Sequence, residues 1–387
     1  MKTGVVVIGG GAIGASVAYW LRLHPKACPV VVIERDPAYR LASTPRASGG
    51  VRRLFSLAEN IRLSQFSIPF FEDFAARMAV DGEAPDIGFK KGGYLFIVPE
   101  ASVRMLSDNY RTQKDMGANV VWLDRQALGD KYPSMNVGDL AAAVFSPDDG
   151  WLDPHGALRG FRRKAQALGA TFLRDEAVEI ESAGRVVRKV VLKSGQTIEA
   201  DAVVNAAGAW AKDICRMVGA HVPIEPMRRF EHYFESQDPI EPLPYLKDVE
   251  RLAFRPEGKG YSGGLVDIDE TRGYNFEVNH AYFETTVWPA LARRFPQFEK
   301  TKVKNTLPGL YDQNEFDGNA IIGPGVGGFE NFHMAAGFSG HGLMHAPGCG
   351  RALAELLLDG GYQTIDLTRL GWARIVANRP LPERGII

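Results

Sequence analysis

The residues with the clearest chemical meaning form a glycine-rich turn near the start of the chain. An apolar strand pattern, Val5–Ile8, runs directly into Gly9-Gly10-Gly11-Ala12-Ile13-Gly14. In a G-x-G-x-x-G turn the first glycine makes the tight bend, the second lets the backbone approach a pyrophosphate, and the third lets helix pack on strand. A second strand pattern, 30–33, ends at Glu34, whose carboxylate can accept the hydroxyls of an adenosine ribose. The segment therefore predicts a dinucleotide-binding unit.

Two later segments repeat the pattern of a strand that ends in small residues. One strand pattern ends in Asn205-Ala206-Ala207-Gly208-Ala209-Trp210, and another, beginning at Phe332, ends in Gly337-Phe338-Ser339-Gly340-His341-Gly342-Leu343. Small residues let a ligand approach the backbone, and the N–H groups at a helix start can hold a phosphate or an electronegative ring edge. Both turns therefore have the character of ligand-binding segments.

The elements around these turns follow from caps and periodicity. Asp153-Pro154 is a helix cap followed by a first-turn proline, which predicts a helix as far as Gly169. Strand patterns follow at 178–180 and 186–192, and a helical stretch is expected from Gly350 to Leu358.

The composition of the chain alternates between two kinds of segment, which indicates two interleaved domains. Blocks rich in aromatic residues and short alternating runs predict an antiparallel sheet for substrate binding, inserted into a Rossmann-like nucleotide fold. The predicted fold class is therefore α/β, or α+β overall. We expect a discontinuous nucleotide-binding domain at 1–84, 149–221 and 325–387, and a substrate-binding domain at 85–148 and 222–324.

Composition excludes several classes of protein. The 387 residues suffice for two domains with cores, and a net charge of −1 offers no basic field for nucleic acid. Thr3–Leu21 carries no charge, but its glycines would weaken a membrane helix, so we expect a soluble, untargeted chain with no transmembrane segment. The 3 cysteines lack disulfide or metal spacing, which favours a reducing compartment and a cytoplasmic location. The oligomeric state stays open.

Taken together, these motifs resemble a known family. The opening turn, Ala42-Ser43-Thr44 with Ser48-Gly49-Gly50, Asn205–Trp210 and Gly337–Gly342 are similar to the D-amino-acid oxidase and glycine/sarcosine oxidase superfamily of flavoproteins. Within it, the stretches Ser48–Ile61 and Gly309–Leu343 resemble the branch that contains the mitochondrial FAD-dependent oxidoreductase linked to complex I assembly. The resemblance covers nearly the whole chain.

This resemblance implies FAD as the cofactor rather than NAD. It places Gly9, Gly11 and Gly14 at the pyrophosphate, and Glu34 at the ribose, with Arg35 over the adenine. The remaining implied contacts with the cofactor come from segments spread along the chain: Ala12, Ile13, Ser43, Thr44, Ser48, Gly49, Gly50, the backbone of Val178, Ala207, Gly208, Trp210, Gly337, Ser339, Gly340, His341, Gly342 and Leu343.

The resemblance also indicates how the flavin is held. Some members attach it through a cysteine aligned with Leu310, or through a histidine near the first glycine-rich turns. This chain has leucine at the former position and no histidine between His24 and His155. We therefore expect non-covalent FAD.

The implied chemistry is transfer of a hydride from a carbon bearing nitrogen to flavin N5, which gives an imine that water hydrolyses. The flavin supplies the difficult step, while the protein orients the substrate and stabilises charge. The resemblance implies a small amino acid or amine as substrate, and dioxygen or an electron-transfer partner as acceptor.

Two carboxylate clamps of the relatives are missing here. Sarcosine-oxidase relatives have a lysine where this chain has Met344, and glycine-oxidase relatives have an arginine where it has Tyr311. Arg52, at a position where relatives place an arginine facing flavin and substrate, is the best surviving partner for an anion. Further candidates for the catalytic site are His341, Arg53, His232, Tyr261 and Tyr311.

One more feature bears on the substrate. Arg228-Arg229 precedes the strand pattern 230–235 and suits a larger anionic substrate such as an opine, or equally a helix cap or ion pair. Three functions stay open at this point: oxidation of a secondary or N-substituted amino acid, oxidation of a 2-hydroxy acid with His232 or His341 as base, and a mainly binding or assembly role.

Overall fold

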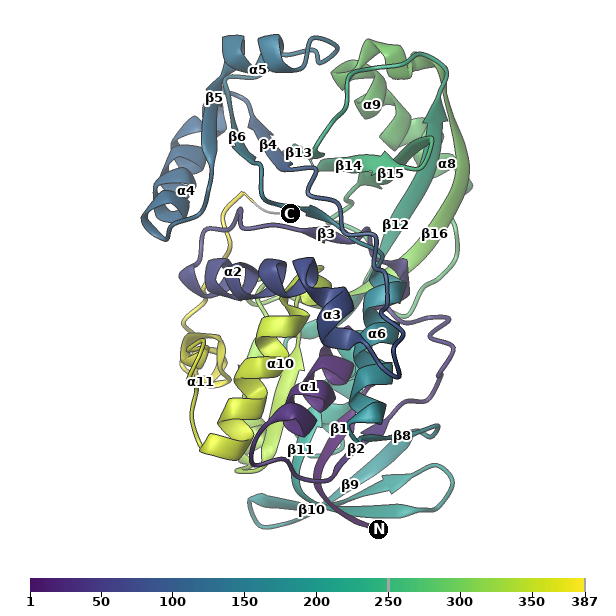
Figure 1. Ribbon diagram of the computed structural model, residues 1–387, viewed down its shortest axis with the longest axis vertical. Helices are drawn as coiled ribbons and strands as arrows, with labels where there is room; N and C mark the ends of the chain where they lie inside the picture. Colours follow the sequence, from purple (N-terminus) through teal and green to yellow (C-terminus); the bar gives the residue numbers. More distant parts are fainter. Residues whose placement is uncertain (249–250, 386–387) are drawn as a thin grey trace.

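The strands of the protein form two large sheets, one in each half of the molecule (Figure 1). The computed structural model describes residues 1–248 and 251–385. Within these ranges each large sheet has eight strands, and a third, two-stranded sheet joins β3 (Gly50–Val51) to β7 (Gly150–Trp151). The α/β class with a Rossmann-like part and a second sheet is therefore confirmed.

The first sheet has the strand order β17-β18-β11-β1-β2-β8, in which β18 to β8 pair in parallel and β17 is antiparallel to β18. β10 pairs antiparallel with β11, and β9 with β10. β1 pairs in parallel with both β11 and β2, as a βαβ unit requires. Its strands are β1 (Lys2–Ile8), β2 (Val30–Ile33), β8 (Thr171–Leu173), β9 (Ala177–Ala183), β10 (Val186–Leu192), β11 (Thr197–Asn205), β17 (Ile321–Gly323) and β18 (Phe332–Ala336).

Helices α1, α6, α10 and α2 pack on one another over this sheet (Figure 1). The helices of the described chain are α1 (Ala12–Leu23), α2 (Ala58–Glu72), α3 (Phe74–Met78), α4 (Val103–Asp115), α5 (Arg125–Lys131), α6 (Pro154–Ala167), α7 (Ala211–Arg216), α8 (His280–Tyr282), α9 (Trp288–Arg294), α10 (Gly342–Asp359) and α11 (Ala373–Val376).

The second sheet has the strand order β16-β12-β15-β14-β13-β4-β6-β5. All of its pairs are antiparallel except β13 with β4, so the prediction of an antiparallel sheet omits one parallel pair. Its strands are β4 (Tyr94–Val98), β5 (Val121–Asp124), β6 (Ala142–Ser146), β12 (Ile224–Ser236), β13 (Tyr245–Asp248), β14 (Leu252–Glu257), β15 (Gly260–Leu265) and β16 (Thr301–Asn314).

The two faces of the second sheet differ in chemistry because side chains alternate along each strand. The outer face packs an apolar core that includes Leu246, Phe234, Phe254 and Phe298 under α9. The face toward the first sheet, here called the inner face, carries polar and aromatic side chains instead: Tyr94, Phe96, Arg229, Glu231, Tyr245, Lys247, Ser262 and Tyr311.

Most predicted elements appear close to the expected bounds. The helix beginning at Asp153-Pro154 is α6, and the pattern 186–192 is β10. Two expectations were wrong in extent. α10 begins at Gly342 rather than Gly350, and β12 begins at Ile224, so Arg228-Arg229 lies inside a strand.

α10 contains Pro347 and three glycines, and it packs closely on α1. A Cβ on Gly350 would overlap the side chain of Ser16 in α1, so a larger residue would separate the two helices. The Ser16 hydroxyl donates a hydrogen bond of 2.7 Å to the carbonyl of Ala346.

The predicted domain bounds stay a prediction, although β17 lies before residue 325 and pairs with β18 in the first sheet.

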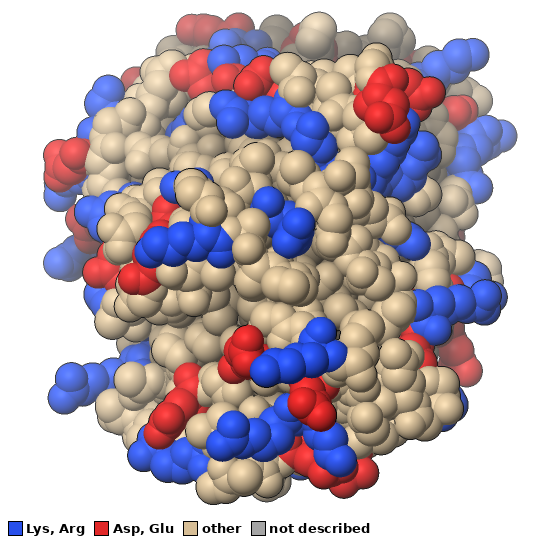
Figure 2. All heavy atoms as spheres, turned by 60° about the horizontal axis from the view of Figure 1, so that its bottom comes forward, with Lys and Arg blue, Asp and Glu red and all other residues tan. Residues whose placement is uncertain are grey.

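Within the described residues, no helix is both long enough and apolar enough to cross a membrane. The face in Figure 2 shows Lys and Arg side chains mixed with Asp and Glu rather than gathered by sign.

The contact between Gly14 and the first turn gives a testable prediction. A Cβ at Gly14 would overlap the carbonyl oxygen of Gly9. We expect Gly14→Ala to lower the free energy of unfolding by about 1–3 kcal/mol, the usual cost of overpacking. Denaturant titration measures it. Gly129→Ala in α5, where a new Cβ meets only Val137 at an ordinary 3.5 Å, is the matched control and should leave stability unchanged or higher.

Candidate functional site

A cavity of about 600 Å³ runs from the glycine-rich turn after β1 to the ends of β12 and β16. Its walls come from all three ligand-binding segments recognised in the sequence. The predicted cofactor-binding residues that line it are Gly9, Gly11, Ala12, Ile13, Glu34, Arg35, Ser43, Thr44, Ala207, Gly208, Trp210, Gly340, Gly342 and Leu343; Arg229, Leu310 and Tyr311 also line it.

The glycines of the first turn have the separate roles that the motif predicts. Gly9 has φ +100°, and a Cβ there would lie 2.5 Å from the Ala206 carbonyl. At Gly11, in contrast, a Cβ would meet only the Thr44 hydroxyl, at 3.6 Å, so this side of the turn opens on the cavity. The Thr44 hydroxyl accepts the Ala12 N–H at 3.2 Å. The start of α1 is thus shaped to receive a phosphate.

Glu34 is held in place from two sides. Its carboxylate accepts the N–H of Gly10 at 2.9 Å and the N–H of Asp36 at 2.8 Å. Burial raises the pKa of Glu34, while these hydrogen bonds oppose the shift. The Tyr39 hydroxyl nearby has no hydrogen-bond partner, and burial raises its pKa to about 12. The unpartnered Tyr39 hydroxyl lies beside Glu34 at the cavity, and the contact of Glu34 with a ribose stays a prediction.

Stacked side chains form one end of the cavity. The Arg35 guanidinium lies 4.0 Å from the ring centre of Trp210, and Tyr274 stacks on the same indole at 5.6 Å. This arrangement suits a flat, electron-rich ring such as adenine.

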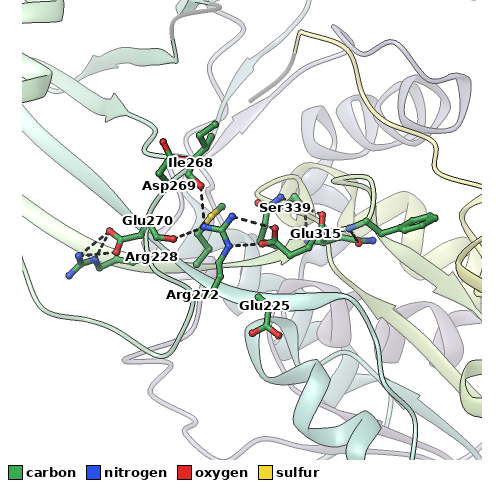
Figure 3. A network of polar contacts seen from close by, with 12 residues as sticks. Glu225, Arg228, Ile268, Asp269, Glu270, Arg272, Glu315 and Ser339 are labelled. Atoms are coloured by element: carbon green, nitrogen blue, oxygen red, sulfur yellow. Dashed lines mark hydrogen bonds and ion pairs between the residues drawn. The ribbon is translucent and has the colours of Figure 1, made fainter. Parts of the chain in front are cut away.

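The segment 266–279, which carries Tyr274, is pinned to the strands beside the cavity. Arg228 of β12 forms a two-bond ion pair with Glu270, and Arg272 pairs with Glu315, which follows β16 (Figure 3). Arg228 is therefore a structural ion-pair partner of this segment.

The turn after β18 is shaped by its own hydrogen bonds. The Asp312 carboxylate accepts the N–H groups of Gly337 and Phe338 at 2.7 and 3.1 Å, and burial raises the pKa of Asp312 to about 6. Ser339, at φ +49°, accepts the Asn314 N–H at 2.9 Å. Gly337 and Ser339 thus shape the turn without lining the cavity.

Ser48, Gly49 and Gly50 lie against the inner face of the second sheet. The Tyr245 hydroxyl donates to the Ser48 hydroxyl at 2.9 Å, and a Cβ on Gly50 would lie 2.8 Å from the Tyr245 ring. Gly49, at φ +81°, is packed against the Leu152 carbonyl. These three residues position the segment that leads to Arg52 and do not line the cavity.

Arg52 is buried, with 3% of its surface exposed, in a setting of aromatic rings. Its guanidinium lies 4.7 Å from the ring centre of Phe55, and 5.5 Å from those of Tyr94 and Phe96. Its Nη2 lies 3.0 Å from His341 Nε2, and its Nε has no partner. Burial and then the Arg52 charge hold the pKa of His341 well below its usual value, so this imidazole is neutral.

The comparison with known proteins places this site in a family. The family described as DAO, FAD dependent oxidoreductase, matches residues 4–356. The chain belongs to the DAO family of FAD-dependent oxidoreductases. This DAO-family chain is 36% identical over 427 residues to FAD-dependent oxidoreductase domain-containing protein 1 of Xenopus laevis, covering 100% of this chain and 85% of that protein.

Two further relatives have names that state a substrate. The DAO-family chain is 28% identical to human mitochondrial sarcosine dehydrogenase, over 92% of this chain and 40% of that protein. It is similar to the crystal structure of L-proline dehydrogenase from P. horikoshii, with a TM-score of 0.85 and 26% identity over 98% of this chain and 99% of that one.

The remaining predicted site residues of the DAO-family chain lie elsewhere. His232 and Tyr261 do not line the cavity, because the alternation of side chains along their strands places both on the outer face of the second sheet. His232 lies 2.9 Å from the Thr306 hydroxyl and packs on Phe283, and Tyr261 packs on Phe298. Val178 is exposed at 46% and its neighbour Ala177 lines the cavity, while the contact of the Val178 backbone with adenine stays a prediction.

Arg53 has a structural partner. Its guanidinium and its backbone N–H both bind the buried carboxylate of Asp149, each at 2.8 Å. Tyr311 does lie at the cavity, where its ring faces Gly340 and the Arg229 guanidinium lies 5.1 Å from the ring centre.

The inner face also carries Glu231 and Lys247, which sequence reasoning missed. Burial raises the pKa of Glu231 to about 7, and its carboxylate accepts the Ser262 hydroxyl at 2.6 Å. Burial, followed by the charges of Arg52 and Arg229, holds the pKa of Lys247 well below its usual value. Charged residues in otherwise apolar strand patterns were the available signal, but such residues commonly face solvent.

The geometry of Glu34 predicts its effect on cofactor binding. Glu34→Gln replaces one acceptor oxygen by an NH2 group that faces a backbone N–H, so we expect FAD affinity to fall about 10-fold to 100-fold. Titration of the apoprotein with FAD, followed by flavin fluorescence, measures the dissociation constant. Glu199→Gln, at an exposed position of β11, is the control and should bind FAD as the unchanged protein does. Equal affinities for all three would contradict a ribose role for Glu34.

Proposed function

We propose that this protein oxidises the C–N bond of a secondary or N-substituted amino acid with FAD as hydride acceptor. The observation that carries the proposal is the cavity itself. One end has a phosphate-binding turn and an acid, and the other reaches the inner face, with Tyr311 and Arg229 in its lining and Arg52 nearby. The names of sarcosine dehydrogenase and L-proline dehydrogenase, both relatives, support this substrate class.

The residues of the cavity fit FAD. Gly11 leaves its side of the turn open, and Glu34 keeps free lone pairs beside the unpartnered hydroxyl of Tyr39. When bound, FAD supplies a hydride acceptor at N5, and oxidation of the amine gives an imine that water hydrolyses.

The remaining work belongs to the protein. Arg52 holds a carboxylate of the substrate, and the neutral His341 fixes the guanidinium through their 3.0 Å contact. Tyr94, Phe96 and Tyr311 exclude water from the inner face, which strengthens the attraction between Arg52 and an anion.

The histidines favour an amine over a 2-hydroxy acid. Oxidation of a hydroxy acid needs a base that takes the hydroxyl proton. His232 lies on the outer face, and the lowered pKa of His341 makes it a weak base. An amine in its neutral form needs no such base.

The cytoplasmic location and the acceptor, dioxygen or an electron-transfer partner, stay predictions from the sequence.

Non-covalent attachment of FAD is also part of the proposal. No cysteine or histidine is among the described residues that line the cavity, and Leu310 occupies one of the family's attachment positions.

Anaerobic reduction of the flavin tests the proposed reaction. We expect the FAD absorption band to bleach when the holoprotein is mixed with a secondary amino acid such as sarcosine or proline, and not with 2-hydroxy acids. Readmission of air then distinguishes an oxidase, which recolours rapidly, from a dehydrogenase. Bleaching by hydroxy acids alone would contradict the proposal, and a flavin that no substrate reduces would leave a binding role.

Denaturation tests the mode of attachment. We expect acid precipitation of the yellow holoprotein to leave all FAD in the supernatant, since the described residues that line the cavity include no cysteine or histidine to which the flavin could be attached. Absorbance of the pellet redissolved in denaturant measures any retained flavin. A yellow pellet would show a covalent link.

A further inference from the structure

Three cations lie on or beside the inner face without an ion-pair partner. Among the described residues, Arg52, Lys247 and Arg229 have no carboxylate within ion-pair distance. Other buried arginines of the protein do: Arg294 pairs with Asp139 and Asp248, and Arg374 with Asp317. Arg52 is buried, and an unpaired charge away from water is costly; an anion bound beside Lys247 would also favour the charged form of that lysine, whose pKa is otherwise lowered. The inner face is therefore suited to anions that the protein does not itself supply.

Lys247 comes from the middle of β13, where lysines rarely lie. Its backbone pairs with Phe96 on one side and Ala253 on the other. Its ammonium lies 5.9 Å from the ring centre of Phe96, and the Arg52 guanidinium lies 5.5 Å from the same ring centre. The two cations therefore share one aromatic wall.

Arg229 reaches the same region from β12 and lines the cavity. One Nη donates only to backbone carbonyls, those of Asp267 and Arg228, and the other contacts the sulfur of Met227. Its Nε is buried without a partner. Strand alternation places its side chain on the same face of the sheet as that of Lys247.

The nearest acid on this face does not neutralise them. Glu231 accepts a hydrogen bond from Ser262 and forms no ion pair with any described residue, and Arg255 on the neighbouring strand β14 is itself paired with Glu257. One carboxylate held by Arg52 would leave Lys247 and Arg229 uncompensated. A second carboxylate on the same substrate would neutralise that side.

We propose that Lys247 and Arg229 form a second anion subsite beside Arg52, and that the substrate is a secondary amine with two carboxylate groups, an N-(carboxyalkyl) amino acid. This inference rests on the proposed function, which it narrows. Arg52 takes the carboxylate of the amino acid, and Lys247 with Arg229 takes the carboxylate of the N-substituent.

Equilibrium binding of an unreactive pair of probes tests the subsite. Glutarate has the chain length of two carboxymethyl groups on one nitrogen, and pentanoate replaces one of its carboxylates by a methyl group. We expect glutarate to perturb the FAD band of the holoprotein with a dissociation constant about 10-fold to 100-fold lower than that of pentanoate. Lys247→Met should remove this preference without changing the affinity for pentanoate, and Lys247→Arg should keep most of it.

Matched variants guard against loss of the fold. Lys259→Met, in the exposed turn of the neighbouring β14–β15 hairpin, should bind both probes as the unchanged protein does. Arg229→Met should weaken glutarate binding as Lys247→Met does. The FAD content and melting temperature of each variant are measured alongside.

The inference fails if glutarate binds no tighter than pentanoate, or if Lys247→Met binds glutarate unchanged. It also fails if Lys247→Met shifts only the reduction potential of the flavin, because the lysine would then serve the cofactor. Bleaching by sarcosine and iminodiacetate separates the two proposals. If the protein prefers glutarate but no amine bleaches the flavin, the anion subsite is supported and the proposed amine oxidation is contradicted. If sarcosine bleaches the flavin but glutarate is not preferred, the proposed function is supported and the subsite is contradicted.

Discussion

The approach of α1 to β1 at the first turn is the contact on which the rest of the site depends. Gly14 packs on the Gly9 carbonyl, and Gly9 packs on Ala206 from β11. Because these contacts leave no room for a Cβ, they fix three segments relative to one another. The ends of β1, β2 and β11 then open into one cavity, and Gly11 is left facing it. A substitution at Gly9 or Gly14 would therefore displace all three segments of the site rather than a single side chain.

The opposite wall follows from alternation along the strands of the second sheet. A shift of one residue in β12 would replace Arg229 and Glu231 at the inner face by Phe230 and His232. The pairing of β12 with β16 runs over most of both strands, from Ile224 to Ser236, which secures that choice. The register of β12 thus decides which charged side chains reach the site. The position of the buried Arg52 beside it depends on the segment around Ser48, which the hydrogen bond from Tyr245 to Ser48 holds in place.

The local parts of this architecture could be predicted from the sequence. The glycine turn, α6 and β10 depend on neighbouring residues, and caps and periodicity indicate them. The face of β12 could not be predicted, because Arg229, Glu231, His232 and Tyr233 put polar groups on both sides of the strand. In the sequence Lys247 has the pattern of a surface residue, and only the folded sheet shows that β4 and β14 lie on either side of its strand. The length of α10 was missed because Pro347 normally ends a helix, and only its packing on α1 explains its persistence.

The cavity wall at Gly340–Leu343 has a consequence for the order of events during synthesis. The first turn emerges from the ribosome before the residues that complete the cavity, which belong to β16 and to the start of α10, about three hundred positions or more further along the chain. Since domains generally fold as units once their chain has emerged, we expect the cofactor cavity to be complete only after the start of α10 has emerged. Until then the cationic inner face and the bare strand β1 are exposed together. A cofactor bound in this cavity would therefore stabilise the fold only after the start of α10 has been made.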